Sequence, residues 1–96
     1  MRVRILSLAE IEMFDAAMFY EKQVAHLGDS FLSIMETAID DLCAQPETWP
    51  EIGDGFRKRP LRRFPYSIIY RIDEEEIVIV AVMHQRRRPC YWIERL

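Results

Sequence analysis

The chain has 96 residues, which suits one domain over residues 1–96 and leaves no room for a second. Half of the residues are hydrophobic and 30% are charged, which is typical of a globular protein and excludes an intrinsically disordered chain. No apolar run approaches the roughly 20 residues of a membrane helix and no signal peptide is recognisable, so we expect a soluble cytoplasmic protein with no membrane partner.

The formal net charge of −3 combines two halves of opposite sign. Residues 1–55 carry three basic and eleven acidic side chains, whereas residues 56–96 carry ten basic and five acidic ones. Arginines that only decorate a solvated sheet would be the simplest explanation. Their density instead favours a C-terminal surface that meets a polyanion or an acidic peptide.

The N-terminal segment predicts a short strand and the start of a helix. Charged and apolar residues alternate from Arg2 to Leu6, as in a strand. Ser7 and Glu10 have the spacing of a capping box, and Leu6 and Ile11 can form the hydrophobic staple beside it. The apolar residues that follow at helical spacing are Met13, Ala16, Ala17, Tyr20, Val24 and Leu27.

Gly28 suits the left-handed position just past the end of this helix. A second helix should start at Asp29 or Ser30 and stop at Pro46. Its apolar stripe consists of Phe31, Ile34, Met35, Ala38 and Leu42. Because a single glycine is too short for another arrangement, the two helices should form an antiparallel hairpin.

The second half of the chain predicts strands. After a loop at 46–55, residues 56–61 can form a strand that Pro60 restricts to a sheet edge or a bulge. Residues 64–72 alternate in polarity, and residues 77–83 are apolar on both faces, as in a central strand. The order β-α-α-β-β-β predicts an α+β fold, with an N-terminal helical hairpin packed on a small twisted antiparallel sheet.

Familiar metal and catalytic motifs are missing. The sequence has no glycine-rich phosphate loop, no H-E-x-x-H and no G-x-S-x-G. Cys43 and Cys90 form no C-x-x-C pair, and adding His26 and His84 does not produce a spacing typical of zinc. We therefore expect no metal and no other cofactor.

Three basic groups accompany the predicted strands and form the candidate binding surface. They are Arg57, Lys58 and Arg59 on the first strand of the meander, Arg62 and Arg63 at its turn, and Arg86, Arg87 and Arg88 after the last strand, followed by Tyr91 and Trp92. The first two groups should be neighbours, and the third can approach the same edge. Such a surface can bind phosphate oxygens bidentately.

Metal-free cleavage of RNA would need a base, a cation for the phosphorane and an acid. The local candidates are His84, the arginines and Tyr91. His84 is also in phase with the apolar residues of the last strand, so a histidine at the edge of the core is the simpler explanation.

Several elements of the chain occur together in one family. They are Arg57-Lys58-Arg59-Pro60-Leu61, Phe64-Pro65-Tyr66-Ser67-Ile68-Ile69-Tyr70, Ala81-Val82-Met83-His84 and Arg87-x-Pro89-x-Tyr91-Trp92, with Leu27-Gly28-x-x-Phe31 and Pro46-x-x-Trp49-Pro50 before them. In this combination the whole chain resembles the RelE/ParE superfamily of type II toxin–antitoxin toxins. The resemblance implies the same β-α-α-β-β-β fold and a role in growth arrest or plasmid stabilisation.

The superfamily divides into two activities. RelE-like members cut mRNA on the ribosome, and the resemblance would then assign the nuclease site to Arg57, His84, Arg86, Arg87 and Tyr91. ParE-like members inhibit DNA gyrase and need no such site. RelE-like nucleases also use lysines around the second helix, whereas this chain has Glu36, Asp40, Asp41, Glu47, Glu51 and Asp54 there. These carboxylates would repel RNA, which favours the ParE-like branch.

Both branches imply a partner antitoxin, a small and often acidic protein that folds around the toxin. The implied target is DNA gyrase, with the ribosome and mRNA as the alternative. A third hypothesis is a non-toxic interaction module whose arginines only bind an acidic partner peptide.

Overall fold

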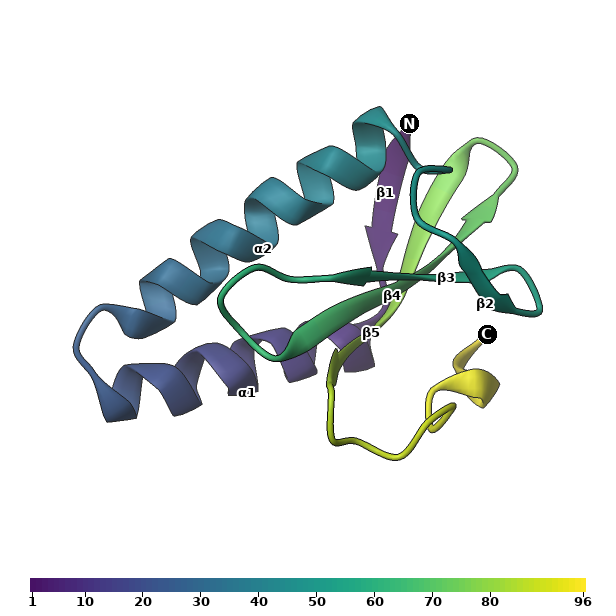
Figure 1. Ribbon diagram of the computed structural model, residues 1–96. Helices are drawn as coiled ribbons and strands as arrows, with labels where there is room; N and C mark the ends of the chain where they lie inside the picture. Colours follow the sequence, from purple (N-terminus) through teal and green to yellow (C-terminus); the bar gives the residue numbers. More distant parts are fainter.

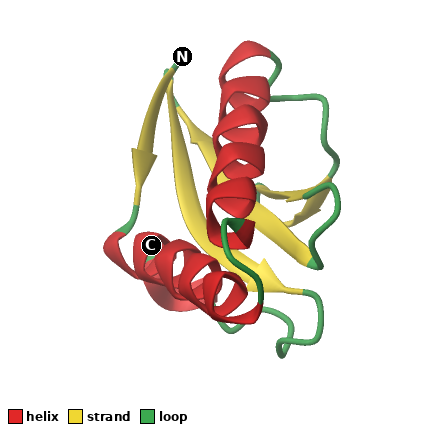
Figure 2. Ribbon diagram, turned by 90° about the vertical axis from the view of Figure 1, so that its left-hand side faces the viewer, coloured by secondary structure: helices red, strands yellow, loops and turns green.

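The computed structural model describes residues 1–96 and consists of two helices packed on one face of a five-stranded sheet (Figures 1 and 2). The elements are β1 (Arg2–Ile5), α1 (Ser7–Gln23), α2 (Leu27–Ala44), β2 (Glu51–Gly53), β3 (Phe56–Pro60), β4 (Tyr66–Asp73), β5 (Glu76–His84) and the 3-10 helix η1 (Ile93–Arg95). The predicted α+β fold with an N-terminal helical hairpin is confirmed.

The sheet has the strand order β1-β5-β4-β3-β2 and is mixed. β2 to β5 form an antiparallel meander, but β1 lies parallel to β5, with Val3 beside Ile77. A wholly antiparallel sheet was therefore the wrong expectation for this edge, because the three reversals of the meander turn β5 opposite to β2 and leave it running in the same direction as β1. β2 also falls within the segment expected to be a loop, where Glu51 pairs with Arg57.

The sheet is buried on both faces, and β5 contributes to both. Its Ile77 and Ile79 pack under the helices together with Tyr70 of β4. Val78 and Val80 face the other way, in a smaller cluster that the C-terminal segment covers. This double cover explains why residues 77–83 lack polar alternation.

The start of α1 differs from the predicted capping box. α1 begins at Ser7, its N-cap is Leu6, and no side chain caps it. The backbone N–H of Leu6 donates to the Ile79 carbonyl oxygen at 3.0 Å, continuing the β1–β5 pairing. The chain thus enters the helix directly from the sheet, which moves Ser7 one position inside it and leaves the box unformed.

The junction between the helices lies earlier than expected. α1 ends at Gln23 and α2 begins at Leu27, so Gly28 lies in the first turn of α2. The left-handed residue is His26, with φ at 69°. Gly28 is instead a close-approach residue, because a Cβ there would lie 2.5 Å from the Ala17 carbonyl oxygen of α1.

Candidate functional site

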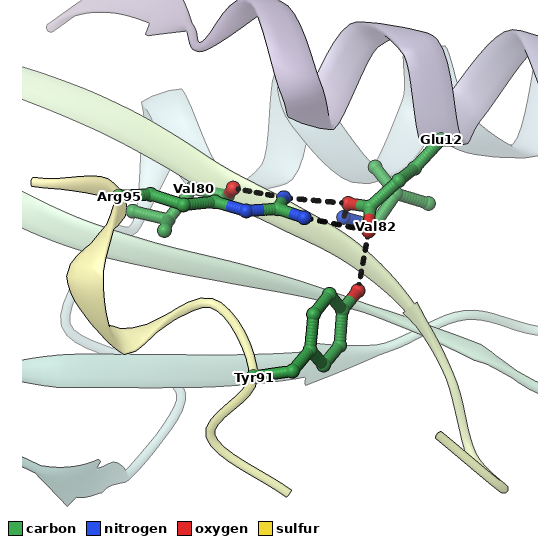
Figure 3. Close-up of polar contacts among 5 residues, drawn as sticks. All are labelled: Glu12, Val80, Val82, Tyr91 and Arg95. Atoms are coloured by element: carbon green, nitrogen blue, oxygen red, sulfur yellow. Dashed lines mark hydrogen bonds and ion pairs between the residues drawn. The ribbon is translucent and has the colours of Figure 1, made fainter. Parts of the chain in front are cut away.

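The C-terminal segment, residues 85–96, is tied to α1 through the carboxylate of Glu12 (Figure 3). The Tyr91 hydroxyl donates to Oε2 of Glu12 at 2.6 Å. The Arg95 guanidinium donates to both carboxylate oxygens, at 2.9 and 3.0 Å. Both partners come from the far end of the chain, so Glu12 alone joins the N-terminal helix to the C-terminus through side-chain bonds.

Glu12 and Arg95 also bind backbone groups on an unpaired stretch of the β5 edge. β1 pairs with β5 only as far as Ile79, which leaves the following backbone groups on that edge without a strand partner. The N–H of Val82 donates to Glu12 Oε1 at 3.0 Å, and Arg95 donates to the Val80 carbonyl oxygen at 3.0 Å. Glu12 and Arg95 therefore satisfy polar groups that would otherwise be buried without partners.

The environment of Glu12 favours its charged form. Burial works to raise the pKa of this carboxyl, but hydrogen bonds from Arg95, Tyr91 and the Val82 N–H outweigh it, and the pKa lies below its ordinary value. Burial and the neighbouring Glu12 carboxylate raise the pKa of Tyr91 well above its usual range. Tyr91 is thus a protonated donor held in place, which makes it a poor general acid or base.

The other aromatic side chain of this segment is buried. Trp92 is 2% exposed and packs edge-on against Phe56 of β3, with ring centroids 4.8 Å apart. The Arg87 guanidinium stacks on the Tyr91 ring, 4.1 Å from its centroid. Neither ring is a free platform for a nucleic-acid base in this conformation.

The last arginine group lies in the turn after β5. Arg86 and Arg88 are exposed, and their side chains make no hydrogen bond or ion pair. Their charge is therefore available to a partner, whereas Arg87 is partly engaged by Tyr91. These arginines remain predicted binding residues.

Two arginines of β3 are engaged within the protein. Arg57 donates to the Trp49 carbonyl oxygen at 2.6 Å and ties the 46–50 segment to the sheet. Arg59 donates to the Asp41 carboxylate of α2 at 2.7 Å and stacks on the Trp49 ring, 4.8 Å from its centroid. The side chains of Arg57 and Arg59 are only 17% and 12% exposed. Their main role is therefore structural, since they hold the 46–50 segment and α2 on β3.

The basic groups do not converge on one surface. Lys58 alternates with Arg57 and Arg59 along β3 and therefore points to the opposite face of the sheet. Arg62 and Arg63 lie exposed in the β3–β4 turn. The group at 86–88 follows β5, which β4 separates from β3. The sheet order thus separates the group at 86–88 from β3, whereas Arg59 of β3 lines one cavity with Arg62 and Arg63.

His84 lies at the end of β5 and is half-buried. Its ring packs edge-on against Tyr66, with centroids 5.0 Å apart, and its Nδ1 accepts the backbone N–H of Arg86 at 3.0 Å. It lines a cavity of about 260 Å³ with Arg87 and Tyr91, but Glu12 and Asp15 line the same cavity. These carboxylates disfavour a phosphate there.

The outer face of α1 carries an exposed apolar stripe that the sequence patterns above did not single out. Its side chains are 48% to 56% exposed and belong to Leu8, Ile11, Phe14, Met18 and Phe19. One signal was present in the sequence, since apolar residues of α1 occur on more than one side of the helix. A single sheet can cover only one face of such a helix, so the other face is left open.

The chain offers no obvious metal site. No group of three or more His, Cys, Asp or Glu side chains is arranged to hold a metal ion, and Cys43 and Cys90 are free thiols. Neither long helix has the length and hydropathy needed to cross a membrane. The surface features therefore consist of the apolar stripe of α1, the free arginines and the segment held by Glu12.

Comparison with known proteins connects this chain to one family. The family model described as the ParE toxin of type II toxin-antitoxin system, parDE, matches residues 3–89. The fold is similar to a solved structure described as the chromosomal ParDE TA system from P. aeruginosa, with a TM-score of 0.59 and 21% sequence identity over 88% of this chain and 95% of that chain. No curated protein matches the sequence.

Proposed function

This chain belongs to the ParE toxin family of type II toxin–antitoxin systems, and we propose that, as one toxin domain over residues 1–96, it arrests growth by inhibiting DNA gyrase when it is free of a cognate antitoxin. The proposal implies that it acts in the cytoplasm, where gyrase works. The exposed arginines at 86–88 are the proposed contacts to the target.

The separation of the nuclease candidates is the observation that carries this proposal. Arg57 is on β3 with its guanidinium bonded to the Trp49 carbonyl oxygen, and β4 lies between it and the strand that bears His84. The Tyr91 hydroxyl is bonded to Glu12 and has a raised pKa. Arg57 is therefore absent from the cavity that His84 lines, and Tyr91 is not available there as an acid, which favours inhibition by binding over RNA cleavage.

The apolar stripe of α1 supports the proposed antitoxin partner. Five large apolar side chains, each about half exposed, lie on the outer face of this helix, and contiguous exposed apolar patches often mark interaction sites. An amphipathic helix of an antitoxin can cover such a stripe with its own apolar face. We propose that the antitoxin binds there.

A supercoiling assay with purified gyrase tests the proposed activity. Gyrase introduces supercoils into relaxed plasmid DNA, and the toxin should reduce this in a dose-dependent way. The variant Arg86→Ala/Arg87→Ala/Arg88→Ala should inhibit less, while Arg2→Ala, an exposed arginine of β1, should inhibit like the wild type. Full supercoiling at a large excess of toxin would contradict the proposal.

Ribosome-dependent mRNA cleavage is the second candidate. The cavity that His84, Arg87 and Tyr91 share is the observation in its favour. Cleavage of mRNA in translating ribosomes, with supercoiling unaffected, would select this activity. In that case His84→Ala should abolish cleavage, and in the gyrase case it should leave inhibition unchanged.

A further inference from the structure

A second cavity lies between α2 and the β3–β4 turn, away from the segment that Glu12 holds. Its volume is about 300 Å³, and three arginines line it, namely Arg59, Arg62 and Arg63. α2 contributes the remaining wall with Ile34, Thr37, Ala38 and Asp41. Three guanidinium groups and one carboxylate leave this cavity with a net positive charge.

The three arginines are not equally free. Arg59 is bonded to Asp41 at 2.7 Å, and its Nε is buried without a partner. Arg59 therefore supplies charge to the wall but few accessible donors. Arg62 and Arg63 make no ion pair and both are exposed, and the Arg63 guanidinium lies over the Phe64 ring, 5.4 Å from its centroid. Their donors remain available to an anion that enters the cavity.

The backbone of the turn points to a role for the Arg63 side chain. Arg63 has φ at 67°, in the left-handed region where glycine or asparagine is the usual residue. The turn is closed by backbone hydrogen bonds, from Phe64 N–H to the Arg62 carbonyl oxygen at 2.8 Å and from Leu61 N–H to the Tyr66 carbonyl oxygen at 2.8 Å. Arginine is less favourable than glycine or asparagine in this conformation, and backbone strain of this kind is found at sites where a side chain binds a ligand.

We propose that this cavity is a binding site for a carboxylate, supplied by an aspartate or glutamate side chain of a partner polypeptide. Arg62 and Arg63 donate to the carboxylate oxygens, and the positive charge of Arg59 assists from behind. Ile34 and Ala38 offer apolar contact for the methylene groups that carry the carboxylate. This site is separate from the proposed gyrase contacts and does not depend on them.

The surroundings of the cavity suit a carboxylate side chain. Asp41 lies in the wall, and Glu36 and Asp40 are exposed on the same helix. These three carboxylates offset the charge of the three arginines, so a phosphate dianion gains no electrostatic advantage here over a carboxylate, while Ile34 and Ala38 suit the methylene groups of a side chain. A nucleic-acid backbone would meet the acidic surface of α2 along its path.

NMR titration of the intact protein tests the site with defined probes. The probes are the blocked tripeptide acetyl-Ala-Glu-Ala-amide, its glutamine counterpart and inorganic phosphate. The glutamate peptide should shift the Nε–H signals of Arg62 and Arg63 and the amide signal of Thr37, with weak, saturable binding. The glutamine peptide should leave these signals unchanged.

Two variants and one matched control separate the side chains from the fold. Arg62→Gln and Arg63→Asn should each weaken binding of the glutamate peptide on the order of tenfold. Arg63→Asn should keep or raise the Tm, because asparagine tolerates the left-handed conformation. Arg2→Gln removes the same charge from β1 and should bind the peptide like the wild type.

Other results would contradict the proposed site or its ligand. Equal binding of the glutamate and glutamine peptides, or an unchanged affinity in Arg62→Gln, would overturn the site. Saturable binding of phosphate without binding of the glutamate peptide would overturn the choice of ligand. Because the assay contains no gyrase, a negative result would leave the proposed toxin activity to be judged by supercoiling alone.

Discussion

Glu12 is the side chain that holds the C-terminal segment, residues 85–96, against α1. It accepts hydrogen bonds from Tyr91, Arg95 and the Val82 N–H at once. A sequence pattern cannot reveal such a residue, because Glu12 looks like any polar position of a helix and its partners are 70 to 83 residues away. The pairing exists only once the sheet has brought the chain end beside α1.

We expect Glu12→Gln to destabilise the protein by about 2–4 kcal/mol. The amide has no charge for Arg95, whose side chain is 14% exposed, and it cannot accept every bond that the carboxylate accepts. Urea denaturation at neutral pH measures the loss. Glu10→Gln, an exposed position on the same helix, should change the free energy of unfolding by less than about 0.5 kcal/mol. Equal stability of the two variants would contradict the role of Glu12.

The lowered pKa of Glu12 predicts a pH dependence of stability. A carboxyl that is more acidic in the folded state stabilises the fold above its ordinary pKa of 4.5, and this contribution is lost as the pH falls through the lower folded-state pKa. The wild type should therefore lose more stability than Glu12→Gln between neutral pH and about pH 3. Parallel denaturation curves across this range would show that Glu12 is not the group responsible.

At the scale of elements, the sequence predicts those helices and strands that follow from local hydrophobic patterns. The two helices, the strand at 66–73 and the apolar central strand follow from their periodicities, which the structure confirms. The helix ends were predicted less well, because long-range contacts decide them. Leu6 pairs with Ile79 before α1 can use a serine cap, and Gly28 is required by the approach of α1 rather than by a helix end.

The apolar stripe of α1 predicts a substitution that separates binding from folding. Ile11→Gln/Met18→Gln replaces two half-exposed side chains with good helix formers, so the free energy of unfolding should stay within about 0.5 kcal/mol of the wild type. If the antitoxin covers this stripe, co-expression should no longer neutralise the variant fully. Colony counts with graded antitoxin induction measure this effect.

The control for this substitution is Val24→Gln, which changes an equally exposed apolar residue beyond the end of α1. It should be neutralised like the wild type. Full neutralisation of the double variant would move the antitoxin interface away from α1.

At the scale of the whole molecule, the strand order decides where the basic residues lie relative to one another, which the sequence alone could not predict. The bias of ten basic residues in the C-terminal part was visible from composition, but not its division among β3, the β3–β4 turn and the turn after β5. β4 separates the first group from the last, and partners on α2 and in the 46–50 segment occupy Arg57 and Arg59. Among the arginines of these three groups, those in the two turns make no ion pair.

This division predicts how toxicity responds to charge removal in the intact chain. Induction without antitoxin should arrest growth, measured as loss of colony formation. Arg86→Ala/Arg87→Ala/Arg88→Ala should lose most of this effect while remaining folded, because Arg86 and Arg88 have no side-chain partners to lose and Arg87 gives up only its stacking on Tyr91.

Arg62→Gln/Arg63→Asn removes charge of the same sign from the other turn and serves as the comparison. If gyrase is contacted through the turn after β5, this variant should still arrest growth, since its arginines face the cavity beside α2. Equal loss of toxicity in both variants would mean that toxicity depends on the overall positive charge rather than on the position of the arginines. Unchanged toxicity of the triple variant would remove the turn after β5 from the contact with the target.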